Sequence, residues 1–428
     1  MNVGILPSVV TGSVRAPSSK AISHRALVCA ALAGGKSTVR NFLDSDDTNA
    51  TAEALKAFGA RITRKQGAVE IRGATLPLRV PSAPINCGLS GSTIRFIIPL
   101  AALADGRVTL TGEGSLLRRP MGELAHALHQ LGVSCETTGG FPPVTVRGFG
   151  SIPGGKCALR GDVSSQFVSG LLFAAPLAAS PTAITLTTPL ESKPYVELTL
   201  EAMRKFGVRV KASRDFRSFR VSPQQYRPAR FVVEGDWSNA AFLLAAGTLA
   251  GGKKGVRVLG LEKKTKQGDS AIYDVIKRMG GEVFWKGKAL LALPSALRAA
   301  TINAANIPDL VPILAVLACF AEGTTRITHA GRLRLKESNR LAAMATELSK
   351  MGAGIRETRD GLVVKGPCAL HGAVVDSHAD HRIAMSLAVA ALRAQGKTTI
   401  RGAECVAKSY PRFWRDLKFL KASIRPCA

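Results

Sequence analysis

Six segments of this 428-residue chain begin with small polar or charged residues and continue as long apolar runs. Ser, Asp and Asn at such positions cap a helix by accepting a hydrogen bond from one of its free N–H groups. Where no side chain takes up these N–H groups, the positive end of the helix dipole can bind an anion instead. The six starts are Ser19-Lys20, Ser90-Gly91-Ser92, Ser164-Ser165-Gln166, Ser238-Asn239, Pro308-Asp309 and Asp380-His381-Arg382.

Basic residues close to these starts favour anion binding over capping alone. Lys20, Arg25, Arg95 and Arg382 would supply countercharge, and Gly91 leaves room for a ligand oxygen near the backbone. The chemistry that this pattern predicts is the binding of phosphate or carboxylate groups at several helix starts.

Two other motifs do not support a function. Gly35-Lys36-Ser37 resembles the end of a phosphate loop, but it follows a helix and has Ala30 where that loop needs glycine. His378, Asp380 and His381 are metal-ligand types, yet no second cluster with matching spacing accompanies them. We therefore expect neither a metal nor a cofactor.

The elements that carry these residues repeat along the chain. A helix that ends at glycine before a β-branched stretch occurs five times, with the glycine at positions 59, 132, 207, 280 and 352. Such a glycine fits a left-handed C-cap, and the alternating Val and Ile residues that follow fit a strand. An Ala-rich apolar helix and a strand precede each of these segments. The sequence thus predicts six α/β units, each with an inner and an outer helix.

The sixth unit is too short to be complete on its own. Units begin near residues 19, 91, 164, 235, 307 and 379, which leaves the last with only 50 residues. We expect the N-terminal strand to complete it. Three units per domain then give one domain of residues 19–234 and a second, discontinuous domain of residues 1–18 and 235–428.

Composition narrows the choice of ligand. The chain has 58 basic and 30 acidic residues, a formal net charge of +28, which predicts anionic partners. No three Lys or Arg residues are consecutive, and the few aromatic residues are not interleaved with them, so a nucleic-acid interface is disfavoured.

The eight cysteines show no metal-ligand spacing and are expected to be isolated reduced thiols. No apolar run reaches the ~20 residues of a membrane helix. We expect a cytoplasmic monomer that binds small molecules.

Ten motifs, in order along the chain, resemble the 5-enolpyruvylshikimate-3-phosphate synthase family. They are PSSKAISHR (17–25), GLSGSTIR (88–95), LRRP (117–120), DVSSQF (162–167), ESKPY (191–195), EGDWS (234–238), IPD (307–309), RLKESNR (334–340), DHR (380–382) and AKSYP (407–411). The resemblance implies a two-domain, inside-out α/β barrel in which each domain has three βαβαββ repeats.

The reaction implied by the resemblance moves the enolpyruvyl group of phosphoenolpyruvate to the 5-hydroxyl of shikimate 3-phosphate and releases phosphate. It serves chorismate and aromatic amino acid biosynthesis. A base must take the hydroxyl proton, an acid must protonate the vinyl carbon, and cations must hold two polyanions together. The second domain would carry the acid/base carboxylates, and the first would mainly bind shikimate 3-phosphate.

The resemblance assigns three sets of residues. The catalytic positions are Lys20, Asp309 and Glu337, with the division of proton transfers between the carboxylates left open. The shikimate 3-phosphate positions are Lys20, Arg25, Ser164, Ser165, Gln166, Ser192, Tyr195, Asp309 and Lys336. The phosphoenolpyruvate positions are Lys20, Gly91, Arg119, Gln166, Arg340, Arg382 and Lys408.

Each assignment has a plainer alternative. Asp309 could be a helix cap, Glu337 a solvated helix charge and Tyr195 a packing residue, while the arginines could form surface salt bridges. These alternatives make no prediction about catalysis.

Four positions depart from the family pattern. Ala21 replaces a usual Ser, Leu89 replaces a frequent Asn, Asn339 replaces Asp, and Arg332 lies where many members have Asn. We expect these changes to affect substrate affinity and sensitivity to glyphosate, which competes at the family's phosphoenolpyruvate site, more than the reaction itself.

Two other functions compete with this one. The sister transferase that acts on UDP-N-acetylglucosamine normally has a cysteine in the loop that corresponds to 111–120, and here that loop has none. A non-catalytic basic protein that binds nucleic acid is supported only by the net charge.

Overall fold

The computed structural model describes residues 1–427, and the chain divides into two compact units. Ser18–Val233 form what we call the continuous unit. Met1–Pro17 and the chain from Glu234 onwards form the discontinuous unit. The domain limits expected from repeat lengths differ from these by one residue.

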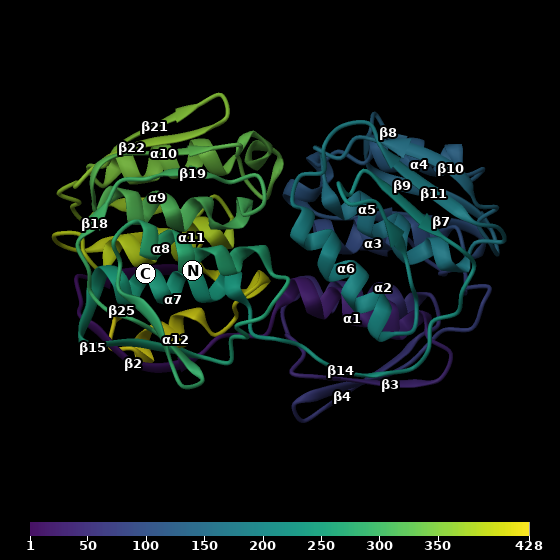
Figure 1. The fold of residues 1–428 in the computed structure, drawn as a ribbon, viewed down its shortest axis with the longest axis horizontal. Coiled ribbons are helices and arrows are strands. Elements are labelled where there is room, and N and C mark those ends of the chain that lie inside the picture. Colours follow the sequence, from purple (N-terminus) through teal and green to yellow (C-terminus); the bar gives the residue numbers. More distant parts are fainter. Residues whose placement is uncertain (428) are drawn as a thin grey trace. The chain divides into compact units, whose positions relative to one another are not determined.

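Three sheets of one pattern make up the strands of the continuous unit (Figure 1). In each sheet the first pair of strands is parallel and the other two pairs are antiparallel. The orders are β14(Arg230–Val232)-β3(Lys36–Arg40)-β5(Ala68–Arg72)-β4(Arg61–Lys65), β6(Ile85–Asn86)-β7(Asp105–Thr111)-β9(Phe141–Phe149)-β8(Ser134–Thr138), and β10(Gly155–Leu159)-β11(Thr182–Leu186)-β13(Ser218–Val221)-β12(Lys211–Ala212).

Its helices alternate between apolar and amphipathic. The apolar helices α1 (Lys20–Leu32), α3 (Gly91–Ala101) and α5 (Ser165–Ala174) are buried along nearly their whole length, as expected for helices without a polar face. The amphipathic helices α2 (Asp46–Ala57), α4 (Gly122–Gln130) and α6 (Lys193–Lys205) keep one exposed face. Gly170 permits α5 to lie close to α3, because a Cβ there would be 2.2 Å from the carbonyl oxygen of Arg95.

The discontinuous unit repeats this plan (Figure 1). Its sheets are β16(Val283–Lys286)-β17(Ala289–Ala292)-β15(Gly251–Leu259)-β2(Val10–Arg15), β18(Leu297–Arg298)-β20(Ala321–Thr328)-β22(Gly361–Gly366)-β21(Gly354–Thr358) with β19(Thr301–Asn303) paired to β20, and β23(Val374–Asp376)-β24(Thr398–Arg401)-β1(Asn2–Leu6)-β25(Ser423–Cys427). Its inner helices are α7 (Trp237–Ala250), α9 (Val311–Cys319) and α11 (His381–Ala391), and its outer helices are α8 (Ile272–Arg278), α10 (Arg340–Lys350) and α12 (Phe413–Phe419).

The N-terminal strand β1 lies between β24 and β25 and is antiparallel to both. The start of the chain therefore completes the sixth repeat, as the repeat lengths predict.

Six repeats and the mixed α/β class are confirmed, with helices inside each unit and sheets around them. Within residues 1–427, each sheet stays open rather than closing into a continuous barrel.

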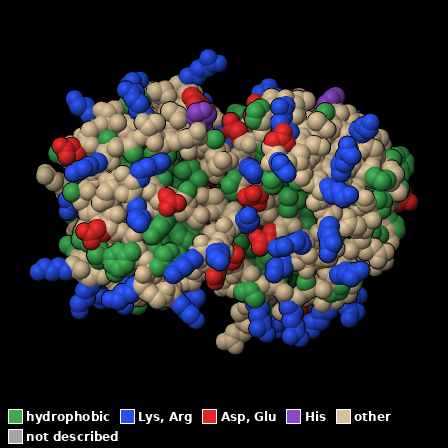
Figure 2. Space-filling model, viewed as in Figure 1, with side chains coloured by type: hydrophobic (Ala, Val, Ile, Leu, Met, Phe, Trp, Pro, Cys, Tyr) green, Lys and Arg blue, Asp and Glu red, His purple; other side chains and the backbone are tan. Residues whose placement is uncertain are grey.

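On the face shown in Figure 2, the Lys and Arg side chains are scattered rather than gathered in one stripe. In the view of Figure 2, Lys and Arg side chains outnumber Asp and Glu and are spread among neutral groups. No helix in the part of the chain described by the structure is long and apolar enough to cross a membrane.

The cysteines are free thiols, but two of them are not isolated as expected. Cys368 N–H donates to the carbonyl oxygen of Cys319 at 2.7 Å, and the two thiols also share a hydrogen bond. That bond lowers the pKa of Cys368 to about 6, against the effect of its partial burial. The end of α9 and the end of β22 bring the two together, which spacing along the chain does not reveal.

Candidate active site

Three helix starts of the continuous unit are capped. The hydroxyl oxygens of Ser19, Ser90 and Ser164 accept hydrogen bonds from the N–H groups of Ile22 (3.4 Å), Thr93 (3.2 Å) and Gln166 (3.2 Å). Capping therefore occurs at each, and it takes up only one of the free N–H groups of each helix. Lys20, Gly91 and Gln166, which the sequence assigns to substrate binding, lie in the first turns of these helices.

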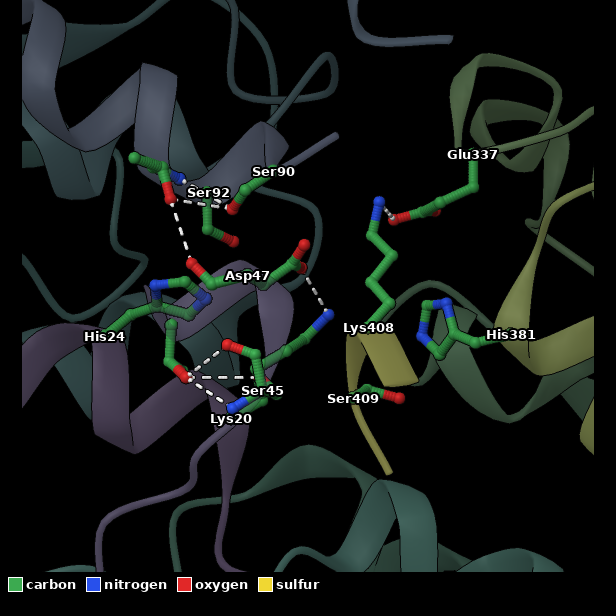
Figure 3. Close-up of polar contacts among 12 residues, drawn as sticks. Lys20, His24, Ser45, Asp47, Ser90, Ser92, Glu337, His381, Lys408 and Ser409 are labelled. Atoms are coloured by element: carbon green, nitrogen blue, oxygen red, sulfur yellow. Dashed lines mark hydrogen bonds and ion pairs between the residues drawn. The ribbon is translucent and has the colours of Figure 1, made fainter. Parts of the chain in front are cut away.

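Lys20, in the first turn of α1, forms an ion pair with Asp47 (Figure 3). Lys20 Nζ donates to Asp47 Oδ2 at 2.7 Å, and both side chains are largely buried. Asp47 lies in the first turn of α2, where the helix dipole favours a carboxylate. Its carbonyl oxygen accepts a hydrogen bond from Thr93 Oγ1 (3.3 Å), which in turn donates to Ser90 Oγ (2.7 Å). These contacts fix Asp47, and Asp47 fixes the ammonium group of Lys20.

Gly91 and Arg119 approach each other closely. A Cβ atom at position 91 would lie 2.6 Å from Arg119 Nη1, so glycine is needed for the guanidinium to rest against the start of α3. Nearby, Gln166 Nε2 donates to Ser92 Oγ at 2.7 Å. Arg95 Nη1 donates to Gln166 Oε1 at 2.9 Å. The starts of α3 and α5 are thus joined by side chains that the motifs GLSGSTIR and DVSSQF supply.

Arg25 is buried and contacts three other groups. Its guanidinium donates to Thr199 Oγ1 (2.9 Å) and to the carbonyl oxygens of Ala21 (2.7 Å) and Tyr195 (2.8 Å). Burial lowers the pKa of Arg25 to about 10. Arg25 therefore joins α1 to α6 and holds the backbone of Tyr195. Ser192, which precedes α6, has a left-handed backbone with φ +56°.

Arg340 binds three carboxylates in the discontinuous unit. Its Nη1 donates to Asp309 Oδ1 (2.9 Å), its Nη2 to Glu337 Oε2 (2.7 Å) and its Nε to Asp380 Oδ2 (2.7 Å). The arginine side chain is only 1% exposed. In such an environment a charged group is stable only when it is paired and hydrogen-bonded.

Two further cations contact these carboxylates. Arg382 Nη2 donates to Asp309 Oδ2 at 2.9 Å, and its Nη1 donates to the carbonyl oxygen of Asp309 at 3.2 Å. Lys408 Nζ lies 3.6 Å from Glu337 Oε1 (Figure 3). Asp309 and Glu337 thus each lie between two cations.

The plainer alternatives for the two carboxylates are wrong. Asp309 lies inside a 3-10 turn, Pro308–Leu310, whose N-cap is Ile307, and α9 begins only at Val311 with Leu310 as its N-cap. Glu337 precedes α10 and is 11% exposed, so it is not a solvated charge on a helix. Both side chains are committed to a buried charge cluster.

The cluster shifts the pKa values of its members. Burial alone would raise the pKa of Asp309, but Arg382, Lys336 and Arg340 hold it well below its usual value. Burial lowers the pKa of Lys336 to about 8, although Asp309 opposes this. Burial and the charge of Asp309 raise the pKa of Asp269 to about 7. Asp309 is therefore a carboxylate at neutral pH, surrounded by cations.

Comparison with known proteins shows the family of the chain. Residues 6–417 match the family model described as EPSP synthase (3-phosphoshikimate 1-carboxyvinyltransferase). The chain belongs to the EPSP synthase family. It is 44% identical to the 3-phosphoshikimate 1-carboxyvinyltransferase of Methanocorpusculum labreanum, covering 99% of this chain and 100% of the relative. It is 42% identical to that of Clostridium kluyveri, covering 99% and 98%.

Solved structures of EPSP synthase agree with the fold. That from Acinetobacter baumannii superposes with a TM-score of 0.82 at 28% identity, covering 100% of both chains. The enolpyruvyl transferase NikO from Streptomyces tendae shares the fold, with a TM-score of 0.81 at 21% identity. As a member of the EPSP synthase family, the chain is a transferase of the shikimate pathway.

Some residues of the EPSP synthase site are not apparent from sequence reasoning. Asp47 anchors Lys20, and Asp380 caps α11 while holding Arg340. Asp269 is buried beside Asp309. The sequence signal that could have identified Asp47 is an acidic residue in the first turn of a helix. For Asp380, the signal is the arginine that follows two residues later. No group of His, Cys, Asp and Glu among residues 1–427 is arranged to hold a metal ion.

Proposed function

We propose that Lys20, Asp309 and Glu337 carry the proton transfers by which this enzyme moves the enolpyruvyl group of phosphoenolpyruvate to the 5-hydroxyl of shikimate 3-phosphate. The observation that supports this assignment is the cluster around Arg340, where two carboxylates are held by the cations that the family motifs supply. Such a cluster offers proton acceptors and an anion-binding charge at one place.

Asp309 is the better candidate for the base. Its carboxyl group stays ionised because three cations lower its pKa, so it can accept the proton of the 5-hydroxyl. The freed oxygen attacks C2 of phosphoenolpyruvate while C3 gains a proton from Glu337, which must enter this step in its protonated form. The Glu337 carboxylate then takes a proton back from C3 as phosphate leaves with the proton held by Asp309, and the enolpyruvyl double bond is restored. Lys20 assists proton transfer and binds phosphoenolpyruvate.

Substrate binding would make Asp309 a stronger base. Arg340 and Arg382 now donate to Asp309, and phosphoenolpyruvate would compete for the same guanidinium groups. Added negative charge close to a carboxylate raises its pKa. The base therefore gains proton affinity at the moment when its substrate arrives. Arg119, Gly91, Gln166 and Lys408 complete the proposed phosphoenolpyruvate set.

The remaining positions would bind shikimate 3-phosphate. Hydroxyl groups at a helix start suit a phosphate dianion, because they donate hydrogen bonds while the helix N–H groups add positive potential. Arg25 contributes partly by holding Tyr195, as its backbone contact shows. The set is Lys20, Arg25, Ser164, Ser165, Gln166, Ser192, Tyr195, Asp309 and Lys336.

The cellular setting follows from the same function. A small-molecule transferase of this kind works as a cytoplasmic monomer that needs no nucleic acid, membrane or cofactor. Its phosphoenolpyruvate site would be the place where glyphosate competes.

Replacement of Lys20 by Met and of Glu337 by Gln tests the assigned roles. Each variant should remain folded and lose nearly all phosphate release, although its thermal unfolding midpoint should fall because the substitution removes one partner of a buried ion pair. Substantial residual turnover in either variant would refute the role of that residue. Glu53→Gln, at an exposed glutamate on α2 that pairs with Lys56, is the matched control and should retain full turnover.

A further inference from the structure

Glu347 is outside the groups assigned to the reaction, yet its carboxylate is almost completely buried. It lies on α10, about two helical turns beyond Arg340, and its side chain is 1% exposed. A buried carboxylate needs hydrogen bonds to replace those of water. Lys350 Nζ supplies two, at 2.9 and 2.8 Å to the two oxygens. The Asp376 N–H donates to Oε2 at 3.0 Å, and His378 Nε2 lies 2.8 Å from Oε1.

Two of these partners belong to the turn that joins β23 to α11. In that turn His378 and Ala379 have φ values of +52° and +53°, conformations that non-glycine residues rarely adopt. Local hydrogen bonds support them: His378 N–H donates to Asp376 Oδ1 (2.6 Å), and Ala379 N–H donates to Ser377 Oγ (3.2 Å). A backbone of this kind keeps its shape only when surrounding contacts enforce it. Two other elements supply such contacts: the Ser377 N–H donates to the carbonyl oxygen of Arg401 at the end of β24 (3.1 Å), and Glu347 on α10 binds Asp376 and His378.

The turn sets the start of α11, and hence two groups of the active site. Asp380 is the N-cap of α11 and accepts a hydrogen bond from the Arg382 N–H at 2.9 Å. The carboxylate of Asp380 binds Arg340, and the guanidinium of Arg382 binds Asp309. A displaced turn would therefore move Asp380 and Arg382 together relative to Arg340.

Helix α10 holds this turn at two separate points. Arg340, in its first turn, binds Asp380, and Glu347, near its end, binds the Asp376 N–H and His378. One attachment would leave the start of α11 free to pivot, whereas two fix its orientation. We propose that Glu347 is a positioning residue that fixes the place of Arg382 for binding phosphoenolpyruvate. This inference rests on the proposed function of Arg382 in that binding.

The test is the effect of Glu347 variants on the two Michaelis constants. Glu347→Ala should raise the KM for phosphoenolpyruvate roughly tenfold to a hundredfold, as expected for a misplaced binding group. The KM for shikimate 3-phosphate, most of whose proposed positions lie in the other unit, should change less than about twofold. Glu347→Gln should fall between Glu347→Ala and the parent chain, because an amide oxygen still accepts from the Asp376 N–H.

Controls separate positioning from a general loss of structure. Glu53→Ala and Glu53→Gln change an exposed glutamate that also pairs with a lysine three residues later, and should leave both constants unchanged. If Glu347→Ala does not fold, His378→Asn replaces it as the test. Asparagine tolerates the left-handed backbone but does not reach Glu347, so the KM for phosphoenolpyruvate should still rise selectively.

The parallel variant Arg382→Lys distinguishes failure of the inference from failure of the proposed function. If it raises the KM for phosphoenolpyruvate and the Glu347 variants do not, Arg382 keeps its role and the positioning role of Glu347 is wrong. If it has no effect, the assigned role of Arg382 fails and the inference fails with it. Equal increases in both Michaelis constants, or reduced stability alone, would show that Glu347 is only structural.

Discussion

Arg340 determines the charge balance of the site in the discontinuous unit. Its three donor contacts bind Asp309, Glu337 and Asp380 at once, and Arg382 and Lys408 add positive charge beside the first two. Removing one partner of a buried pair is costly, because the remaining charge keeps its burial and loses its countercharge. The residue is thus needed for stability as well as for the proposed binding of phosphoenolpyruvate.

Arg340→Met should lower the free energy of unfolding by about 3–5 kcal/mol, measured by urea denaturation, and abolish turnover. The matched control is Arg334→Met. Arg334 pairs with Glu357 at a partly exposed position, where an ion pair contributes about 0–1 kcal/mol. Losses of equal size in the two variants would contradict the account of the buried cluster.

Cys368 should be the most reactive thiol of the chain. The hydrogen bond from Cys319 lowers its pKa to about 6, so it is mainly a thiolate at pH 7 and becomes protonated as the pH falls through 6. Burial raises the pKa of Cys87 and Cys135 to about 12, and these should not react. Iodoacetamide labelling followed by peptide mass analysis, from pH 5 to 8, measures this. A Cys368 labelling rate that still rises steeply between pH 7 and 8 would contradict it.

At the scale of elements, we expect the N-terminal strand to contribute strongly to the stability of the discontinuous unit. β1 is an inner strand of its sheet, and Ile5 on it is completely buried in the core of the discontinuous unit. Its buried side chains belong to the same core as those of the other repeats of this unit.

Ile5→Ala should lower the free energy of unfolding by about 2–5 kcal/mol, because it leaves a cavity in a closely packed core. Leu6→Ala, at the exposed neighbouring position, should have a much smaller effect. Chemical denaturation followed by circular dichroism compares them. Similar losses at both positions would show that β1 is not the buried inner strand described here.

Local signals account for the elements that could be predicted. Glycine C-caps and apolar runs act over a few residues, so the six inner helices, five of the six outer helices and the repeat count are predictable from sequence. Contacts between distant residues are not. Glu347 and His378 are 31 residues apart along the chain, and neither residue type predicts the left-handed backbone at His378 and Ala379. The ion pairs of Asp309 with Arg340 and Arg382 likewise join residues that are far apart along the chain.

At the scale of the whole molecule, the proposed phosphoenolpyruvate residues are divided between the two units. Gly91, Arg119 and Gln166 belong to the continuous unit, whereas Arg340, Arg382 and Lys408 belong to the discontinuous one. The assignments, taken together, predict that one substrate engages groups of both units.

Binding of shikimate 3-phosphate should therefore reduce the radius of gyration measured by small-angle X-ray scattering, since ligand binding between domains favours a closed form. Lys20→Met, which weakens the proposed ligand contacts, should need more ligand for the same change. An unchanged scattering curve at saturating ligand would count against closure.

The central claim is that this chain joins phosphoenolpyruvate to shikimate 3-phosphate. Its most direct test is incubation of the purified protein with both compounds, with phosphate release followed over time and the product identified by mass. The account predicts stoichiometric release of phosphate and formation of the enolpyruvyl ether, with none when UDP-N-acetylglucosamine replaces shikimate 3-phosphate. Absence of phosphate release with the first pair, or equal release with the second acceptor, would contradict it.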